Sequence, residues 1–406
     1  MIHNRKAALG FIFITVLIDV IGFGIIIPVI PKLIAELTGG SISEAAKYGG
    51  WLMFAFSIMQ FIFAPILGGL SDKFGRRPVL LLALLGLSID CVLQAWAPTI
   101  AWLFLGRILA GILGASYTTA SAYIADITEP EKRSESLGII GAAFGLGFII
   151  GPLIGGFASH WGVRVPFIIA AVVAFLNFFY GLFVLPESLK QEHRRPFEWK
   201  RANPIGTFVH LKRYPLIYGM LAAIFFVYIA SYAVQSNWPF YVMYKFKWDE
   251  MQVGYSLAAV GILVALVQGL LIGQIIPKIG QIKTVYVGLT LYFLGLLLFA
   301  FASQGWMMYA FLIPYCIGGI AGPAIQGIIS KQVGASEQGE LQGALTSLIS
   351  LTSIAGPPFM TNLFTYFTSE AALIKFTGAP FFMGAILTML SFFLAYRALS
   401  KNKSQV

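Results

Sequence analysis

Charged side chains are scarce in this chain of 406 residues. Lys, Arg, Asp and Glu make up only 11% of it, whereas apolar and aromatic residues make up 58%, and the mean hydropathy is +0.83. A water-soluble globule needs more polar surface than this composition supplies. The composition therefore excludes a soluble fold and predicts an all-α membrane protein that is surrounded mainly by lipid.

Cysteine and histidine are also rare. The two cysteines, Cys91 and Cys316, fall inside predicted helices and offer neither a disulfide framework nor a metal-ligand spacing. The histidines lie in the N-terminal tail or in predicted loops: His3, His160, His193 and His210. Because no predicted span holds a Ser/His/Asp set, a His/Glu metal cluster or a phosphate-binding loop, we expect no enzyme, no metal and no cofactor.

The net charge of +10 is spread over loops and tails rather than over one soluble face. We therefore expect lipid, and not nucleic acid, as the partner of the basic residues. If both termini are cytoplasmic, most of the Lys and Arg lie on the cytoplasmic side, as the positive-inside rule requires. The sequence thus predicts a multi-pass protein of a bacterial inner membrane with both termini in the cytoplasm.

Apolar stretches of roughly 20 residues recur along the chain, and each is long enough to cross a hydrocarbon core of about 30 Å. They predict twelve membrane-spanning helices, near 7–34, 49–70, 79–97, 99–124, 134–158, 164–185, 215–243, 251–276, 284–302, 305–330, 340–366 and 379–398. A basic linker over 186–214 divides them into an N-terminal six-helix bundle, 1–185, and a C-terminal one, 215–406. We expect this linker to be a solvated hinge that binds anionic headgroups.

The two halves share a register. An offset of 205 residues takes Gly49 to Gly254, Gly68 to Gly273, Lys73 to Lys278, Gly75 to Gly280, Glu135 to Glu340, Gly138 to Gly343, Gly151 to Gly356 and Pro152 to Pro357. Two pseudo-symmetric, parallel repeats can expose a site at the midplane to each side of the membrane in turn. This duplication predicts a transporter that works by alternating access, and we expect a monomer.

The loop after the second span reads Gly-Gly-Leu-Ser-Asp-Lys-Phe-Gly-Arg-Arg-Pro over 68–78 and resembles the signature loop of the major facilitator superfamily. The resemblance implies that Arg76 or Arg77 pairs with Asp126 in a latch on the cytoplasmic side. Asp72 lies where the eleventh helix begins, so it can face the positive end of that helix dipole. A plain positive-inside loop explains the arginines equally well, but it does not require Asp72 or the glycines Gly68 and Gly75.

The fifth span is rich in glycine and is similar to the signature that marks antiporters within this superfamily. Glycines four residues apart make a flat helix face on which a neighbouring backbone packs closely, and a proline bends the helix. Ordinary small-residue packing explains the same pattern, so the antiport assignment rests on the resemblance. The residues of this motif are Gly141, Gly145, Gly151, Pro152, Gly155 and Gly156.

Several spans resemble the tetracycline/proton antiporters, a drug-resistance branch of the superfamily. The matching segments are 17–31 of the first span, 106–114 and 125–126 of the fourth, 318–327 of the tenth and 342–343 of the eleventh, together with Asp90 and Gln268. That branch has a His in the eighth span and an Asp in the ninth that take part in coupling. Here the corresponding positions are Val264 and Tyr292, so the substrate stays open.

Three charged residues lie well away from the ends of the predicted spans, near mid-bilayer, and all are in the first half: Asp19, Asp90 and Arg107. A charge near mid-bilayer costs on the order of 3 kcal/mol, so such residues are functional candidates. Asp90 and Arg107 share a depth and can meet, whereas Asp19 is the expected proton carrier because an acid in apolar surroundings takes up and releases a proton near neutral pH. A static ion pair that only orders the helices is the alternative.

The second half instead offers ring faces and neutral hydrogen-bonding groups that suit a bulky amphipathic ligand. The candidate substrate-binding residues are Tyr228, Tyr232, Gln235, Asn237, Gln268, Tyr292, Tyr315 and Gln326, with Trp238 beside them. Packing explains each of them singly. Trp238, Tyr241 and Tyr244 are also expected to form an aromatic belt at the outer interface.

Together these patterns predict a proton-coupled efflux antiporter for amphipathic drug-like molecules, of the multidrug or tetracycline resistance type. A symporter or facilitator for a small metabolite is the alternative with the same fold. Counterflow with and without a pH gradient distinguishes the two.

Overall fold

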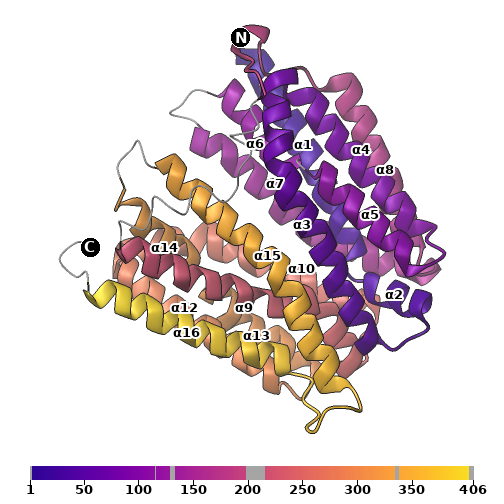
Figure 1. Cartoon of the computed structure of the whole chain (residues 1–406), viewed down its shortest axis with the longest axis vertical. Coiled ribbons are helices and arrows are strands. Elements are labelled where there is room, and N and C mark those ends of the chain that lie inside the picture. The colour runs from indigo at the N-terminus through magenta and orange to yellow at the C-terminus, as the bar shows by residue number, and fades with distance from the viewer. Residues whose placement is uncertain (1, 115, 129–132, 198–214, 334–337, 402–406) are drawn as a thin grey trace. The chain divides into compact units, whose positions relative to one another are not determined.

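The computed structural model describes residues 2–114, 116–128, 133–197, 215–333 and 338–401, and its described elements are helical (Figure 1). The N-terminal half contains α1 Ile2–Ile26, α2 Ile30–Thr38, α3 Ile42–Phe74, α4 Arg76–Ala95, α5 Ile100–Leu113, α6 Ser116–Ile127, α7 Arg133–Ala158 and α8 Val165–Val184. The C-terminal half contains α9 Pro215–Phe246, α10 Glu250–Leu266, α11 Ile272–Ile279, α12 Gln281–Phe301, α13 Gly305–Gly318, α14 Ala321–Ser330, α15 Gln338–Thr368 and α16 Ala379–Lys401.

Within the described residues, 11 helical stretches are long and apolar enough to cross a membrane, which confirms an all-α, multi-pass membrane protein. The eleventh predicted span, 340–366, is the continuous helix α15, which is not among them. Its many Ser and Thr make it more polar than the others. Several of these hydroxyls donate to carbonyl oxygens three or four residues earlier, as in Thr346, Ser350 and Thr361, so the polar groups are satisfied within the helix.

Four predicted spans are interrupted rather than continuous. Between α1 and α2 the chain turns at residues 27–29, where Pro28 cannot supply a backbone donor. α5 and α6 are separated near Gly114, and α13 and α14 at Gly319–Ile320. Between α10 and α11 the helix widens into one π-helical turn, Val267–Leu271. Such breaks are tolerated inside a membrane only where other groups satisfy the freed backbone.

The chain packs as two compact units. Unit 1 comprises the described residues of 1–40, 55–203 and 248–261, and unit 2 those of 41–54, 204–247 and 262–406. Each unit is built mainly from one half of the sequence and takes a short helical segment from the other half. The first turns of α3 belong to unit 2 and the first part of α10 to unit 1. The division at a linker over 186–214 stays a prediction.

In unit 1, α1 packs on α7 along glycine-rich faces. A methyl group added at Gly151 would lie 2.8 Å from the Cα of Gly24, and one added at Gly147 would lie 2.7 Å from the side chain of Val20. A cluster of buried residues from α1, α4, α6 and α7 continues this contact: Ile12, Val16, Val20, Leu80, Ala120, Tyr123, Ile124, Ile140 and Ala143. Glycine thus brings two helix backbones together, and branched side chains fill the space beside them.

Unit 2 is centred on α9, which packs against α15 and α16. Its buried core draws residues from α9, α12, α14, α15 and α16, among them Ile217, Leu289, Ile325, Leu345 and Ala395. Glycines again allow close approach, because a Cβ on Gly295 would lie 2.7 Å from Tyr315 and one on Gly288 would lie 2.8 Å from the backbone of Ala321. The predicted aromatic belt is wrong for two of its members. Trp238 and Tyr241 are 1% and 0% exposed and pack on Phe299, because the ring faces fill the core of unit 2.

A similar glycine–proline contact occurs in each unit, although the glycines are one residue out of the 205-residue register, which pairs Gly254 with Gly49. In unit 1, a Cβ on Gly254 of α10 would lie 2.5 Å from the carbonyl oxygen of Pro152; in unit 2, one on Gly50 of α3 would lie 3.1 Å from that of Pro357. Pro152 and Pro357 are partners under the 205-residue offset. Both α3 and α10 begin with reciprocal capping contacts, between Ser41 and Glu44 and between Asp249 and Gln252.

Candidate transport and gating site

Asp90 and Arg107 form an ion pair between α4 and α5. The Arg107 Nε donates to Asp90 Oδ1 at 3.3 Å, Asp90 is fully buried, and the Arg107 side chain is 13% exposed. The guanidinium carbon also lies 5.9 Å from the centre of the Phe56 ring. Gly106 leaves room for the acid, since a Cβ there would lie 2.5 Å from Asp90 Oδ1. The predicted meeting of these two residues is present, and it compensates each buried charge.

Asp19 lies on α1, where the neighbouring groups on α4 and α6 are neutral. The Ser116 hydroxyl of α6 is within hydrogen-bonding reach of its carboxyl group, and Cys91 of α4 lies close enough to sense its charge. The Asp19 Oδ1 atom is buried and has no hydrogen-bond partner within the described parts of the chain. Among the described residues the acid is therefore held by one hydroxyl and is not paired with a cation. Its role as a proton carrier stays a prediction.

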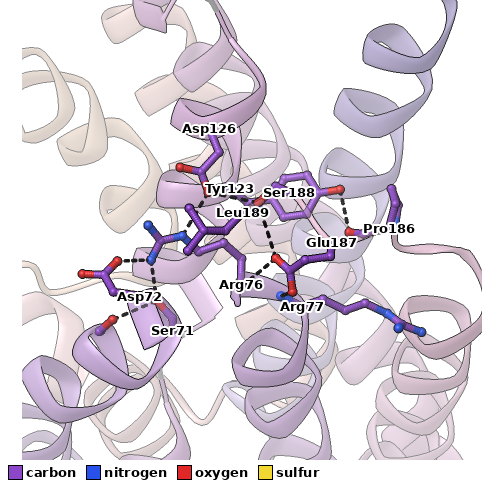
Figure 2. Close-up of polar contacts among 11 residues, drawn as sticks. Ser71, Asp72, Arg76, Arg77, Tyr123, Asp126, Pro186, Glu187, Ser188 and Leu189 are labelled. Carbon is purple, nitrogen blue, oxygen red and sulfur yellow. Dashed lines mark hydrogen bonds and ion pairs between the residues drawn. The ribbon is translucent and has the colours of Figure 1, made fainter. Parts of the chain in front are cut away.

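Arg76 joins two carboxylates at the end of unit 1 where α3, α4 and α6 meet (Figure 2). Its Nε lies 3.0 Å from Asp126 Oδ2, and its Nη1 lies 2.5 Å from Asp72 Oδ1 and 2.6 Å from the Ser71 hydroxyl. We call Ser71, Asp72, Arg76 and Asp126 the latch network. Of the two predicted partners for Asp126, Arg76 is the one that binds it, because its planar fork reaches both acids at once.

The other residues of the signature loop have separate roles. Arg77 donates from Nη2 to the carbonyl oxygen of Leu182, near the end of α8. Gly75 has a φ of 107°, which favours glycine, and Gly68 accepts a hydrogen bond of 2.9 Å from Ser71. The predicted position of Asp72 against the eleventh helix stays a prediction, because residues 334–337 before α15 lie outside the described residues.

Sequence reasoning missed the segment that follows α8 and binds the latch network. Glu187 accepts hydrogen bonds from the backbone N–H groups of Arg76, Arg77 and Leu189, so its carboxylate caps the start of α4 (Figure 2). The Ser188 hydroxyl donates to Asp126 at 3.0 Å. The charge pattern of the loop alone contained no signal for this, because Glu187 is 111 residues away from Arg76.

Two further contacts hold this segment in place. The Tyr123 hydroxyl donates to the carbonyl oxygen of Pro186 at 3.0 Å. The backbone N–H of Arg195 donates to the backbone carbonyl oxygen of Asp72 at 3.1 Å. Together with the latch network the segment lines a polar cavity of about 830 Å³, whose lining residues are Asp72, Arg76, Asp126, Ser188, Leu189, Lys190, Glu192, Arg194 and Arg195.

The glycine motif of α7 serves two neighbours in unit 1. Gly151, Pro152 and Gly155 face α1, and a Cβ on Gly155 would collide with the carbonyl oxygen of Ile25. Gly156 faces the start of α10, where a Cβ would lie 2.7 Å from the carbonyl oxygen of Glu250. Gly141 and Gly145 have open space instead. The motif is therefore a packing surface over its second half, and whether it also specifies antiport stays a prediction.

In unit 2 the structure brings tyrosines from three helices together. The rings of Tyr292 on α12 and Tyr315 on α13 are stacked with centroids 4.8 Å apart, and the Tyr292 hydroxyl donates to that of Tyr315 at 3.1 Å. Tyr228 on α9 lies close enough to both Tyr292 and Tyr232 to interact with them electrostatically. Tyr292, which stands where the resemblance to the antiporter branch places an acidic residue, is therefore one member of a buried aromatic pair.

The predicted amide groups differ in exposure. Gln235 and Gln268 are exposed, Gln326 is half-buried and Asn237 is fully buried. Gln268 lies in the π-helical turn after α10, and Gln235 donates to the Ser231 hydroxyl at 3.0 Å. Val264, one turn before Gln268, is half-buried. Their shared role in substrate binding stays a prediction.

Buried charges within apolar helices, a latch of paired ions and a duplicated helical architecture define a membrane transporter. The chain belongs to the Major Facilitator Superfamily, whose family model matches residues 12–357. This membership identifies a transporter and not an enzyme.

The chain is similar to proteins that confer resistance to an antibiotic. It is 38% identical over 383 residues to tetracycline resistance protein, class C, of Escherichia coli, covering 94% of this chain and 95% of that protein. It is 40% identical over 363 residues to tetracycline resistance protein, class E, of Escherichia coli, covering 89% and 88%. The human organic anion transporter MFSD10 (TETRAN) shares the fold, with a TM-score of 0.72 at 23% identity over 96% of this chain and 99% of that chain.

Proposed function

We propose that this protein exports amphipathic drug-like molecules in exchange for protons. The observation that carries the proposal is the carboxyl group of Asp19, whose Oδ1 atom is buried and which has no paired cation among the described residues. The chain that holds it is similar over nearly its full length to tetracycline resistance proteins. We further propose that it works as a monomer in a bacterial inner membrane with both termini in the cytoplasm, because the basic loops lie on one side in that orientation.

In this mechanism a proton binds Asp19 from the outside and leaves to the cytoplasm as the two units alternate. The Asp90–Arg107 pair keeps a fixed charge distribution beside the moving proton. The latch network, at the cytoplasmic end, holds the state that is open to the outside. The stacked tyrosines of unit 2 supply ring faces for the substrate, whose apolar and polar parts both need contacts.

The experiment uses inverted membrane vesicles acidified inside. Addition of a transported compound releases protons, so a panel of tetracycline, other antibiotics, dyes and metabolites identifies the substrate class. Asp19→Asn abolishes this proton release, whereas Glu36→Gln, an exposed acid on α2, leaves it unchanged. Proton-coupled transport by Asp19→Asn at the normal rate would overturn the proposal. Protons moving in the same direction as the substrate would establish symport instead.

A further inference from the structure

Three buried polar side chains of unit 1 have unused hydrogen-bonding capacity. Thr15 on α1, Thr119 on α6 and Asn177 on α8 are 1%, 2% and 0% exposed. The Oγ1 atoms of both threonines and the Oδ1 atom of Asn177 have no hydrogen-bond partner among the residues that the structure describes. Such groups are normally paired because leaving them unpaired is costly, so three together indicate a role other than packing.

The three lie on one path from Asp19. Thr15 precedes Asp19 by four residues and Thr119 follows Ser116 by three, so each lies one helical turn away on the same face. Ser116 contacts the Asp19 carboxyl group, which brings these two faces together. The Asn177 Nδ2 donates to the carbonyl oxygen of Thr15 at 2.9 Å, which ties α8 to the same place.

The path leads toward the latch end of unit 1. Ile12 and Val16 of α1 belong to one packed cluster with Tyr123 and Ile124 of α6, so earlier residues of α1 meet later residues of α6. Thr15 and Thr119 therefore both lie on the side of Asp19 that is nearer the latch network. The Tyr123 hydroxyl, one turn beyond Thr119, already binds the carbonyl oxygen of Pro186 beside the latch network.

Within the described parts of the chain, the other groups close to the Asp19 carboxyl group are neutral. They are the Cys91 thiol on α4 and the Ser116 hydroxyl on α6, while the adjoining face of α7 presents Gly147 and Gly151. The Asp19 carboxyl group thus has a polar neighbour, Ser116, on one side, and the polar groups of Thr15, Thr119 and Asn177 lie beyond it on that same side.

We propose that Thr15, Thr119 and Asn177 form the cytoplasmic proton path of the transporter. This inference rests on the proposed function of Asp19 as proton carrier. Protonated Asp19 gives its proton to water hydrogen-bonded by the threonine hydroxyls and becomes a carboxylate. Each hydroxyl accepts one proton and donates another, so it ends unchanged, and the Asn177 amide oxygen accepts a hydrogen bond that orients the water. The buried cluster that contains Ile12, Val16 and Tyr123 lies at the end of this path toward the latch network.

The test compares proton-driven transport with counterflow, the exchange of labelled for unlabelled substrate without net proton movement. The double variant Thr15→Val/Thr119→Val should lower the proton-coupled rate roughly tenfold or more and leave counterflow intact. The matching double serine variant retains both hydroxyls and should keep the normal proton-coupled rate. Thr290→Val, an exposed threonine on α12, is the control.

A normal proton-coupled rate in the valine variant would overturn the proposal, as would equal loss in the serine and valine variants. If the double valine variant lacks counterflow and is therefore misfolded, Thr119→Val alone decides by the same criteria. Asp19→Asn in the same assay separates the two ideas. If it loses coupling while the valine variants keep it, only the path is wrong, whereas retained coupling in Asp19→Asn refutes the proposed function itself.

Discussion

The Lys32 ammonium group on α2 lies 2.7 Å from a carboxylate oxygen of Glu250, the first residue of α10. The pair joins residues 218 positions apart within unit 1. Its members differ in exposure, because the Lys32 side chain is 43% exposed and that of Glu250 only 7%. The ion pair and the contact of Gly156 with Glu250 together seat the start of α10 in a unit built mainly from the other half of the sequence.

This difference in exposure predicts unequal effects of removing either partner. Lys32→Met leaves a buried carboxylate without its cation and should lower the free energy of unfolding by about 2 kcal/mol. Glu250→Gln leaves an ammonium group that water can reach, and the loss should stay below about 1 kcal/mol. Chemical unfolding in detergent micelles measures both values, with exposed Lys47→Met as the control. A larger loss for Glu250→Gln would contradict this account.

The latch network predicts that arginine and lysine are not equivalent at position 76. Arg76 binds Asp126 through Nε and Asp72 through Nη1, and a single ammonium group cannot reach both in this geometry. Arg76→Lys should therefore reduce transport by roughly tenfold although the charge is kept. Drug uptake into inverted vesicles measures the effect, and the exposed Lys73→Arg should be silent. Normal transport by Arg76→Lys would show that the fork is dispensable.

The glycine motif of α7 provides a matched pair of substitutions. A methyl group on Gly155 collides with the backbone of Ile25, whereas one on Gly145 meets open space. Gly155→Ala should lower stability by at least about 2 kcal/mol because α1 must move away. Gly145→Ala should be neutral or stabilising by up to about 1 kcal/mol, since alanine favours a helix. Thermal unfolding in micelles tests both, and equal effects would refute the packing role.

The buried pair of Asp90 and Arg107 predicts strong non-additivity. Asp90→Asn leaves an uncompensated cation and Arg107→Gln an uncompensated anion, and each should cost about 3 kcal/mol. The double variant removes both charges and should lose less than the sum of the two. A double-mutant cycle on unfolding in detergent measures the coupling. Additive losses would mean that the pair contributes no interaction energy.

Particular residues show where sequence reasoning succeeded. Asp90 and Arg107 could be paired in advance, because both lie at similar depth in neighbouring helices and an isolated charge is costly there. The resemblance of the signature loop predicted Arg76 or Arg77 as the partner of Asp126, and only the structure showed that Arg76 binds it. Trp238 and Tyr241 were misplaced because aromatic rings near a span end fit an interface and a core equally well. Glu187 was missed because a hydrogen bond to backbone N–H groups leaves no pattern in the sequence.

The sequence by itself determined that the chain lies in a membrane, is helical and is duplicated, because hydropathy, helix length and repeat register are properties of local composition. Only the tertiary structure decided which residues meet. It placed Glu250 beside Lys32, Glu187 on the start of α4, and Tyr292 against Tyr315. Such contacts depend on how the side chains of helices far apart in the chain fit together, and this fit cannot be read from local patterns in the sequence.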